Sequence, residues 1–247
     1  MLEAIAERAA GMSNSDINRR LRIPKSSASY ILRALVKSGY LRRDRETGRY
    51  HLGLRVVSLS HRALAGLNIR EIAQPILRKL VDHSHLTSHL AILDHGQAVY
   101  IEKIDAPGFV KMNTWVGRRL DCHSTSVGKT LIAFLPEDEL QALLAERGLE
   151  KRTPQTITTA SRLFRELEKV REQGYAVDDE ENNLGVRCVA APIFNSEGHV
   201  EASVGLSGTT YQLEKGGVPK TAELVKAAAR KISQQLGSTN LARAHNP

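Results

Sequence analysis

The chain has little of what marks a secreted or membrane protein. It contains two cysteines, Cys122 and Cys188, in 247 residues. They could pair, but nothing else indicates secretion, so we expect reduced thiols and a cytoplasmic location. No apolar run reaches the ~18 residues that a membrane span requires. Residues 1–8 are amphipathic and acidic, and they lack the charged tip and apolar block of a signal peptide.

The sequence also lacks internal repeats and low-complexity segments, and its length suffices for two domains. Its net charge of +8 is unevenly placed. Residues 1–70 hold 14 Lys and Arg against 5 Asp and Glu, a net charge of +9, whereas the remaining 177 residues carry a net charge of −1. This distribution is typical of a phosphate-binding module joined to a neutral domain.

Residues 24–37 have the pattern of a short helix with one apolar stripe and one polar, basic face. Pro24 suits the start of such a helix, and Gly39 suits the residue just past its end. A polar face is often merely solvated, but a second short helix is expected at 13–21, joined through a tight connection as a helix-turn-helix requires. The stripe consists of Ala28, Ile31, Leu32 and Leu35.

Residues 41–52 read as a hairpin around a glycine-containing loop at 44–48, which would form a wing carrying four arginines. Because the polar helix face and the wing lie in the basic segment, we predict that the helix enters the major groove and that the wing holds phosphates. The expected DNA contacts are Lys25, Ser26, Ser27, Tyr30 and Arg33 from the helix, and Arg42, Arg43, Arg45 and Arg49 from the wing.

Beyond these elements the pattern predicts a first helix at 2–10, a connecting helix at 54–65 and a mixed α/β domain from Ile69 onward. In that domain a long helix is expected from Ile69 to Val81. Further helices are expected at 126–134, 136–147, 160–173 and 219–236, and strands at 88–93, 98–104, 110–114, 189–194 and 200–207.

Residues 123–130 end in Gly128-Lys129-Thr130, as a phosphate-binding loop of the form G-x-x-x-x-G-K-[ST] does. Position 123 is histidine rather than the first glycine, and no acidic strand end supplies a magnesium site. We therefore do not expect NTP hydrolysis. Residues 124–126 stand at a predicted helix start, which could instead hold a carboxylate or another small anion.

The densest polar stretch is 174–192, with four consecutive acids at 178–181 followed by Cys188. An acidic run is usually a solvated loop, and a cysteine beside alanines is usually a packing residue. The alternative is a cysteine-dependent enzyme in which His123 activates Cys188. The other histidines and Cys122 match no known zinc spacing, so we expect neither a metal nor a cofactor.

Together these features resemble the IclR family of bacterial transcriptional regulators over almost the whole chain. Several separate motifs match in the right order, which is far more specific than any one of them. They are IPKSS at 23–27, GYLRRD at 39–44, TGRY at 47–50, LG at 52–53, HSTSVGK at 123–129, GYAVDDE at 174–180 and LGVRCVAAP at 184–192.

The resemblance implies an α+β chain. It would have a winged helix-turn-helix DNA-binding domain at 1–53, a linker helix at 54–68, a GAF-like α/β effector-binding domain with a central antiparallel sheet at 69–240, and a flexible tail at 241–247. It also implies assembly as homodimers or tetramers. By position in the family, a small-ligand site would be lined by Leu120, Ser126, Val127, Asp178, Cys188, Gly205 and Ser207.

We therefore expect a ligand-responsive, DNA-binding transcriptional regulator of the IclR type, more specifically a repressor. It would bind a palindromic double-stranded DNA operator as an oligomer and sense a small acidic metabolite such as a carboxylate or sugar acid. Two alternatives remain: an enzyme of GAF-like fold using Cys188 and His123, and a DNA-binding scaffold that senses no ligand.

Overall fold

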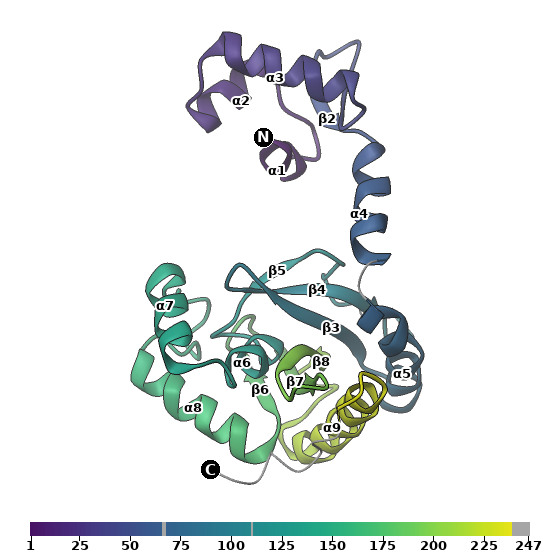
Figure 1. The fold of residues 1–247 in the computed structure, drawn as a ribbon, viewed down its shortest axis with the longest axis vertical. Coiled ribbons are helices and arrows are strands. Elements are labelled where there is room, and N and C mark those ends of the chain that lie inside the picture. Colours follow the sequence, from purple (N-terminus) through teal and green to yellow (C-terminus); the bar gives the residue numbers. More distant parts are fainter. Residues whose placement is uncertain (66–67, 110, 239–247) are drawn as a thin grey trace. The chain divides into compact units, whose positions relative to one another are not determined.

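The structure is a computed structural model that describes residues 1–65, 68–109 and 111–238. The chain divides into two compact units, Met1–Leu67 and Asn68–Pro247, and each is described by itself (Figure 1). No helix in the described ranges combines the length and the apolar character needed to cross a membrane. The tail expected at 241–247 lies outside the described residues.

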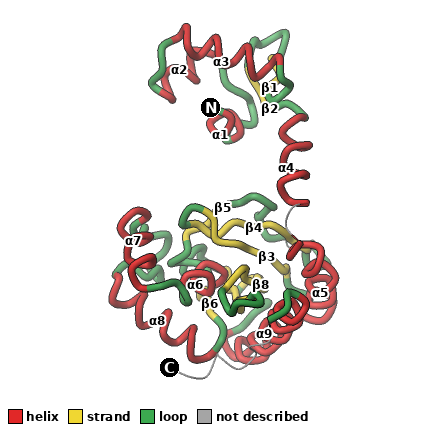
Figure 2. The backbone as a smooth tube through the Cα atoms, in the orientation of Figure 1, coloured by secondary structure: helices red, strands yellow, loops and turns green. Residues whose placement is uncertain are grey.

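The first unit is a three-helix bundle with a small two-stranded wing, followed by a further helix (Figure 2). Its core is built from side chains of the three-helix bundle and the wing, among them Ile5, Ile17, Leu32 and Tyr50. The elements are α1 (Leu2–Ala6), α2 (Asn14–Leu21), α3 (Lys25–Lys37), β1 (Leu41–Arg43), β2 (Tyr50–Leu52) and α4 (Arg55–Ala65).

The helix-turn-helix follows from local sequence chemistry. Ser13 caps α2 in a capping box with Asp16, in which each side chain accepts a hydrogen bond from the other residue's backbone N–H. Arg22 adopts a left-handed conformation with φ 53°, which ends α2 abruptly. Pro24 immediately precedes α3, where its missing N–H costs nothing. The predicted helix-turn-helix is confirmed.

Two details of the first unit differ from the prediction. The first helix ends at Ala6 rather than at Ala10, because the following chain leaves the helix to pair Met12 with Tyr50 of the wing. The N–H of Met12 donates to the carbonyl of Tyr50 at 3.1 Å, and the reverse bond measures 2.8 Å. Ile31 of α3 is 40% exposed rather than buried, because it lies at the edge of the stripe whose centre is Ala28 and Leu32.

The second unit is a six-stranded antiparallel sheet in the order β5-β4-β3-β8-β7-β6, covered by helices on both faces (Figure 1). The predicted α+β class with an antiparallel sheet is confirmed. The strands are β3 (Thr87–Asp94), β4 (Gln97–Ile104), β5 (Arg119–Asp121), β6 (Ala176–Asp179), β7 (Val186–Phe194) and β8 (Val200–Thr209).

One face of this sheet carries α5 (Asn68–Ser84) and α9 (Val218–Gln235), which pack against each other and on β3 and β7. A single 3₁₀ turn, Lys215–Gly217, precedes α9. The other face carries α6 (Ser126–Ile132), with α8 (Ala160–Gln173) packed on it and α7 (Glu137–Arg147) nearby. A buried apolar cluster that includes Tyr100, Leu131 and Leu167 joins these helices to the sheet.

The strand predicted at 110–114 is wrong for residues 111–114, and Val110 lies outside the described residues. The ammonium of Lys103 donates to the carbonyl of Met112 at 3.0 Å and to that of Thr114 at 2.8 Å. A side chain therefore satisfies carbonyls that a neighbouring strand would otherwise satisfy, and the segment is a loop. The strand beside β4 comes later, at Arg119–Asp121.

Candidate functional site

The polar face of α3 is open to solvent. Lys25, Ser26, Ser27, Tyr30 and Arg33, the five side chains predicted to contact DNA, are all exposed, and Tyr30 is 71% exposed.

A buried stripe and an inter-helix hydrogen bond hold this helix in place. Ala28 and Leu32 are fully buried on its opposite side. The amide of Asn14 on α2 donates to the hydroxyl of Ser29 at 2.7 Å, which fixes one helix against the other. These contacts hold the polar face of α3 in place, and Lys25, Ser26 and Ser27 lie at the start of that face.

The four arginines of the wing differ in whether their guanidinium groups form hydrogen bonds within the protein. Arg43 donates from Nε to the carbonyl of Gly48 at 3.2 Å, and Arg49 donates from Nη1 to the carbonyl of Gly11 at 3.0 Å. Both guanidinium groups therefore use some of their N–H donors to stabilise the first unit. Arg42 and Arg45 are exposed and have no partner among the described residues, so their guanidinium groups are available to phosphates.

Asp44 builds the turn of the wing. Its carboxylate accepts hydrogen bonds from the N–H and the hydroxyl of Thr47, at 2.7 and 2.8 Å, and from the N–H of Glu46 at 3.1 Å. These bonds hold the pKa of Asp44 below its usual value. The carboxylate is thus used to shape the loop between the arginines.

The second unit contains a cavity on the α6 side of its sheet, with about 440 Å³ of empty space including its mouth. It lies between the loop that joins β4 to β5 and the loop that joins β6 to β7. Six of the seven side chains predicted to line a ligand site do line it: Leu120, Ser126, Val127, Asp178, Cys188 and Ser207.

The sheet register explains why these side chains meet. Asp178 of β6 is opposite Cys188 of β7, which is opposite Ser207 of β8. Because residues directly opposite one another in neighbouring strands project to the same face, these three form one polar row across the sheet. Residues separated by up to 29 positions in the chain are therefore adjacent in the cavity.

Gly205, the seventh predicted residue, does not line the cavity. It lies two positions before Ser207 on the same face of β8, but Val127 covers it. A Cβ built on Gly205 would lie 3.1 Å from Cγ1 of Val127 and 3.2 Å from Cβ of Ala190. The missing side chain therefore makes room for α6 to pack on the sheet.

The cavity has further lining residues that sequence reasoning missed. They come from the two flanking loops, from β4 and from the start of β7. They are Tyr100, Met112, Thr114, Arg118, Asn182, Asn183 and Val186. Thr125, the N-cap of α6, also lines the cavity and belongs to the helix start at 124–126 that was expected to suit a small anion. The acidic stretch at 178–181 was the one signal that could have directed attention to Asn182 and Asn183, its immediate neighbours.

Asp178 is the buried acid of the cavity. Its Oδ1 accepts hydrogen bonds from the N–H of Glu181 at 2.8 Å and from that of Asn182 at 3.3 Å. Burial, with a further contribution from the nearby charge of Glu181, raises the pKa of Asp178 to about 7. Near neutral pH this carboxyl group can therefore either donate or accept a hydrogen bond.

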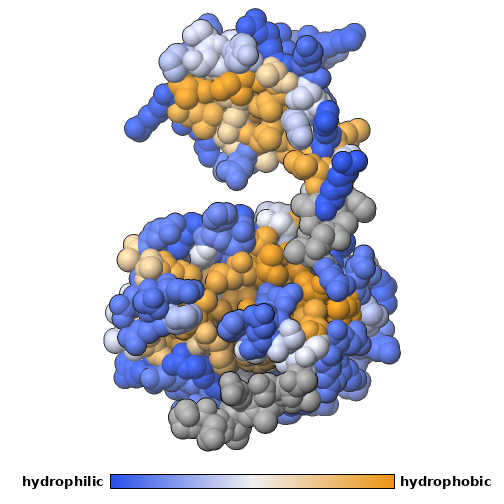
Figure 3. All heavy atoms as spheres, in the orientation of Figure 1, coloured by the Kyte–Doolittle hydropathy of each residue, from blue (hydrophilic) through white to orange (hydrophobic). Residues whose placement is uncertain are grey.

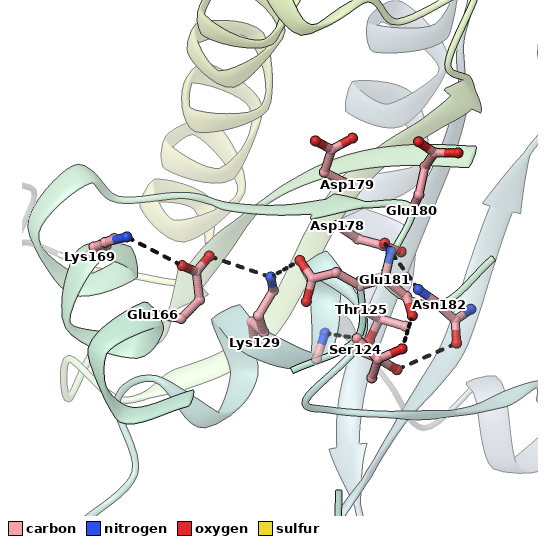
Figure 4. A network of polar contacts seen from close by, with 12 residues as sticks. Ser124, Thr125, Lys129, Glu166, Lys169, Asp178, Asp179, Glu180, Glu181 and Asn182 are labelled. Carbon is pink, nitrogen blue, oxygen red and sulfur yellow. Dashed lines mark hydrogen bonds and ion pairs between the residues drawn. The ribbon is translucent and has the colours of Figure 1, made fainter. Parts of the chain in front are cut away.

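The four consecutive acids do not form the solvated loop that such a run usually forms (Figure 4). Asp179 pairs with Arg187 at 2.6 Å and with Lys215 at 3.1 Å. Glu180 has a positive φ of 61° and accepts a hydrogen bond from the N–H of Gly185 at 2.7 Å.

The fourth acid, Glu181, points away from Asp178 towards Lys129 of α6, whose ammonium lies 2.6 Å from its Oε1 (Figure 4). The backbone carbonyl of Glu181 also accepts a hydrogen bond from the hydroxyl of Thr156 at 2.6 Å. Each acid thus has its own partners, which reduces the mutual repulsion expected of the run. Repulsion remains between Glu181 and Asp178, whose pKa it helps to raise.

Lys129 explains the resemblance to a phosphate-binding loop. Its side chain is fully buried, and its ammonium contacts Glu181 and, at 3.4 Å, Glu166. Gly128 is required because a Cβ there would lie 2.4 Å from Cα of Cys122. The hydroxyl of Thr130 is within 2.6 Å of that of Ser203. The motif therefore packs α6 and does not face the solvent as a phosphate site would.

His89 forms part of the cavity's support. Its ring stacks on Tyr100 with centroids 4.2 Å apart, and its Nε2 lies 2.8 Å from the hydroxyl of Thr114. Burial lowers the pKa of His89 to about 3, so the ring is neutral. It contributes hydrogen bonds rather than charge.

The arrangement does not suit the alternative of a cysteine enzyme. His123 is buried, and its Nε2 contacts the carbonyl of Glu150 at 3.0 Å beside a separate small cavity. Burial and the neighbouring Asp178 raise the pKa of the Cys188 thiol, which keeps it protonated and poorly nucleophilic. Among the described residues, no three potential ligands gather around a metal-sized position.

Two family models match this chain. The model of the IclR helix-turn-helix domain matches residues 1–45, and the model of the bacterial transcriptional regulator IclR C-terminal domain matches residues 61–234. The two matches together span both units.

Individual proteins are similar to the chain over nearly its full length. The HTH-type transcriptional regulator XynR of Escherichia coli K12 is 37% identical over 237 residues, which cover 96% of this chain and 94% of XynR. The HTH-type transcriptional repressor AllR of the same strain is 33% identical over 232 residues, which cover 94% and 86%. The crystal structure of the Thermotoga maritima IclR has a TM-score of 0.76 at 34% identity, and the match covers 96% of this chain and 95% of that one.

Proposed function

We propose that this chain, which belongs to the IclR family of bacterial transcriptional regulators, represses transcription from a palindromic operator and responds to a small acidic metabolite. The family consists of DNA-binding regulators with an effector domain and not of enzymes, so the first unit binds DNA and the second binds an effector. Repression is supported by the relative AllR, which is a transcriptional repressor. We also propose a cytoplasmic location, because a protein that binds an operator must reach the bacterial DNA.

The observation that carries the proposal is the exposed polar face of α3 in the basic first unit. Lys25, Ser26, Ser27, Tyr30 and Arg33 would contact base edges in the major groove. Arg42 and Arg45, which are free of partners in the described structure, would hold phosphates beside it, with Arg43 and Arg49 adding charge from within the wing.

A homo-oligomer is supported by apolar side chains at and before α4. Leu54, Val57 and Leu59 are 85%, 62% and 54% exposed. The space-filling view shows apolar surface near the start of α4 (Figure 3). Such residues on a connecting helix are expected to be covered by a second copy. Because one recognition helix reads few base pairs, two copies would read half-sites about 34–36 Å apart or a multiple of that distance.

The effector would occupy the cavity over the polar row of Asp178, Cys188 and Ser207, and would also contact Leu120, Ser126 and Val127. We assign residues 1–53 to DNA binding, 54–68 to the link and 69–240 to effector binding. A ligand can shift the balance between DNA-binding and non-binding arrangements only by its difference in affinity for the two. We therefore propose that the effector binds the non-binding arrangement more tightly.

Fluorescence anisotropy with the protein's own upstream region tests the DNA proposal. Affinity should fall steeply with salt concentration, because binding releases counterions from the DNA, and should exceed affinity for random DNA of equal length. Equal affinity for both DNAs, or affinity independent of salt, would contradict it. A thermal-shift screen of small carboxylates, sugar acids and aromatic acids tests the effector class, since a ligand of the folded state raises the melting temperature.

A further inference from the structure

The charges that line the cavity are arranged asymmetrically. Among the described residues, Arg118 is the one basic side chain in the lining and Asp178 the one acidic side chain. Arg118 stands on the loop between β4 and β5, and Asp178 stands on β6 at the other edge of the sheet. A ligand in the cavity therefore meets a permanent positive charge from one flanking loop only.

Arg118 is held in place without being neutralised. Its Nη1 donates to the carbonyl of Asn113, and its guanidinium lies over the ring of Trp115, 5.0 Å from the centroid. In the described part of the chain it has no carboxylate partner, unlike Arg119, which pairs with Asp94. The remaining N–H groups of Arg118 are thus free to donate to an anion.

The loop that carries Arg118 is itself anchored. Lys103 donates to the carbonyls of Met112 and Thr114, and the hydroxyl of Thr114 contacts His89. At the base of the loop the N–H of Tyr100 donates to the carbonyl of Arg118 at 3.1 Å. The guanidinium is therefore fixed before any ligand arrives, which lowers the entropic cost of binding.

Other polar groups that line the cavity are available to form hydrogen bonds with a ligand. Tyr100 and Ser126 are 6% and 2% exposed as residues. Both line the cavity, and neither hydroxyl hydrogen bonds to any described residue. Asp178 uses Oδ1 for two backbone N–H groups, and the Cys188 thiol lies beside its carboxyl group. These cavity-lining groups can exchange hydrogen bonds with a ligand that supplies hydroxyl groups, which an apolar ligand cannot do.

We infer, resting on the proposed function, that Arg118 binds the carboxylate of the effector and that the effector is a small polyhydroxy acid. Its hydroxyl groups bond to Tyr100, Ser126 and Asp178. Arg118 is then the residue that selects acids over neutral polyols, a role that neither the polar row on the sheet nor α6 supplies. A planar guanidinium suits a carboxylate because two N–H groups can donate to its two oxygens.

The test uses the full-length protein and matched ligand pairs. Isothermal titration calorimetry is run with glycerate, threonate, arabinonate and gluconate, and with the neutral amide of each acid. The variants are Arg118→Gln, Arg118→Lys and, as a control of equal charge change at the next residue, Arg119→Gln. Thermal unfolding of each variant without ligand checks the fold, and Arg118→Lys serves as the test variant should Arg118→Gln fail to fold.

The wild type should bind at least one acid more tightly than its amide. Arg118→Gln should weaken binding of that acid by about tenfold to a hundredfold and leave the amide unchanged. The affinity of Arg118→Lys for the acid should lie between those of the wild type and Arg118→Gln, because an ammonium keeps the charge but cannot donate two parallel hydrogen bonds to the carboxylate. Arg119→Gln should match the wild type.

The inference is overturned if no acid of the panel binds, if Arg118→Gln binds the acid as the wild type does, or if Arg119→Gln loses as much affinity. Operator binding by the ligand-free protein separates this from the proposed function. A wild type that binds its operator but no acid contradicts the inference alone. A wild type that does not bind DNA contradicts the proposed function.

Discussion

The ammonium of Lys129 lies 2.6 Å from Oε1 of Glu181, and no part of the lysine side chain is exposed to solvent. This pair joins α6 to the turn that follows β6. Burial raises the pKa of Glu181, whereas Lys129 opposes that rise. The ion pair with Lys129 therefore offsets the free-energy cost of burying the carboxylate of Glu181.

Replacing Lys129 by methionine should lower the free energy of unfolding by about 3–5 kcal/mol, because the carboxylate of Glu181 loses its partner while it stays buried. The double variant Lys129→Met with Glu181→Gln should recover most of that loss. Lys215→Met is the surface control. Lys215 pairs with Asp179 but is 76% exposed, so its loss should cost less than about 1 kcal/mol. Urea denaturation measures all three, and a double variant no more stable than the single one would refute the pairing argument.

Replacing Asp178 by asparagine should change how stability depends on pH. The pKa of Asp178 is raised to about 7 in the folded chain, against about 3.9 when unfolded. Between these values the folded state holds a proton that the unfolded state has lost, so this group makes wild-type stability fall as pH rises. The stability of the asparagine variant does not fall with pH in this way, because asparagine does not titrate. Its side-chain oxygen can still accept the hydrogen bond from the N–H of Glu181.

Relative to the wild type, Asp178→Asn should therefore gain roughly 1 kcal/mol in unfolding free energy per pH unit from pH 5 to pH 7. Above pH 7 the difference should level off. Urea denaturation at pH 5, 6, 7 and 8 measures it. A difference between the two proteins that does not vary with pH would show that Asp178 titrates normally.

Replacing Gly128 by alanine should destabilise the second unit by roughly 3 kcal/mol, even though alanine favours helices. The added Cβ would lie 2.4 Å from Cα of Cys122 and 2.6 Å from its carbonyl oxygen, and backbone atoms cannot swing aside. Gly216→Ala is the matched control, since a Cβ there meets nothing within 4 Å. Thermal unfolding of both variants checks this, and equal melting temperatures would contradict the close approach of α6 to Cys122.

Tyr30 and Arg42 should contribute differently to DNA binding. Tyr30→Ala should cost about 1–3 kcal/mol on the operator and little on random DNA, because the side chain would contact bases. Arg42→Gln should weaken binding to both DNAs alike and reduce the salt dependence by about one phosphate contact. Tyr211→Ala, at an exposed tyrosine of the second unit, should change neither. An unchanged preference for the operator in Tyr30→Ala would remove Tyr30 from base recognition.

Much of the fold could be predicted because the deciding signals are local. The helix predicted at 160–173 is observed at Ala160–Gln173, where Gly174 ends it in the left-handed conformation. Strands were predicted at 88–93 and 98–104, and the tight turn that joins β3 to β4 lies between them. His95 and Gly96 have the positive φ angles that such a hairpin needs. Chains with these signals specify their elements without help from distant residues.

The rest depends on partners far away in the sequence. Lys129 looked like a phosphate ligand because its acceptor, Glu181, is 52 residues further on. Arg118 was not singled out in the sequence, because only the folding of its loop brings it into the cavity. For the polar row, the resemblance to a family pointed to the correct residues, but the register that aligns Asp178 with Cys188 exists only in the sheet.

The hydrogen bonds from Lys103 to the loop before β5 affect how the ligand preference of such a protein can change during evolution. Lys103 binds the carbonyls of Met112 and Thr114, and every amino acid has a carbonyl. Substitutions along this loop can therefore alter the wall of the cavity while the anchor persists. New ligand preferences are expected to arise here at lower cost to folding than at Glu181 in the turn beside Asp178, where a substitution would break the buried ion pair with Lys129.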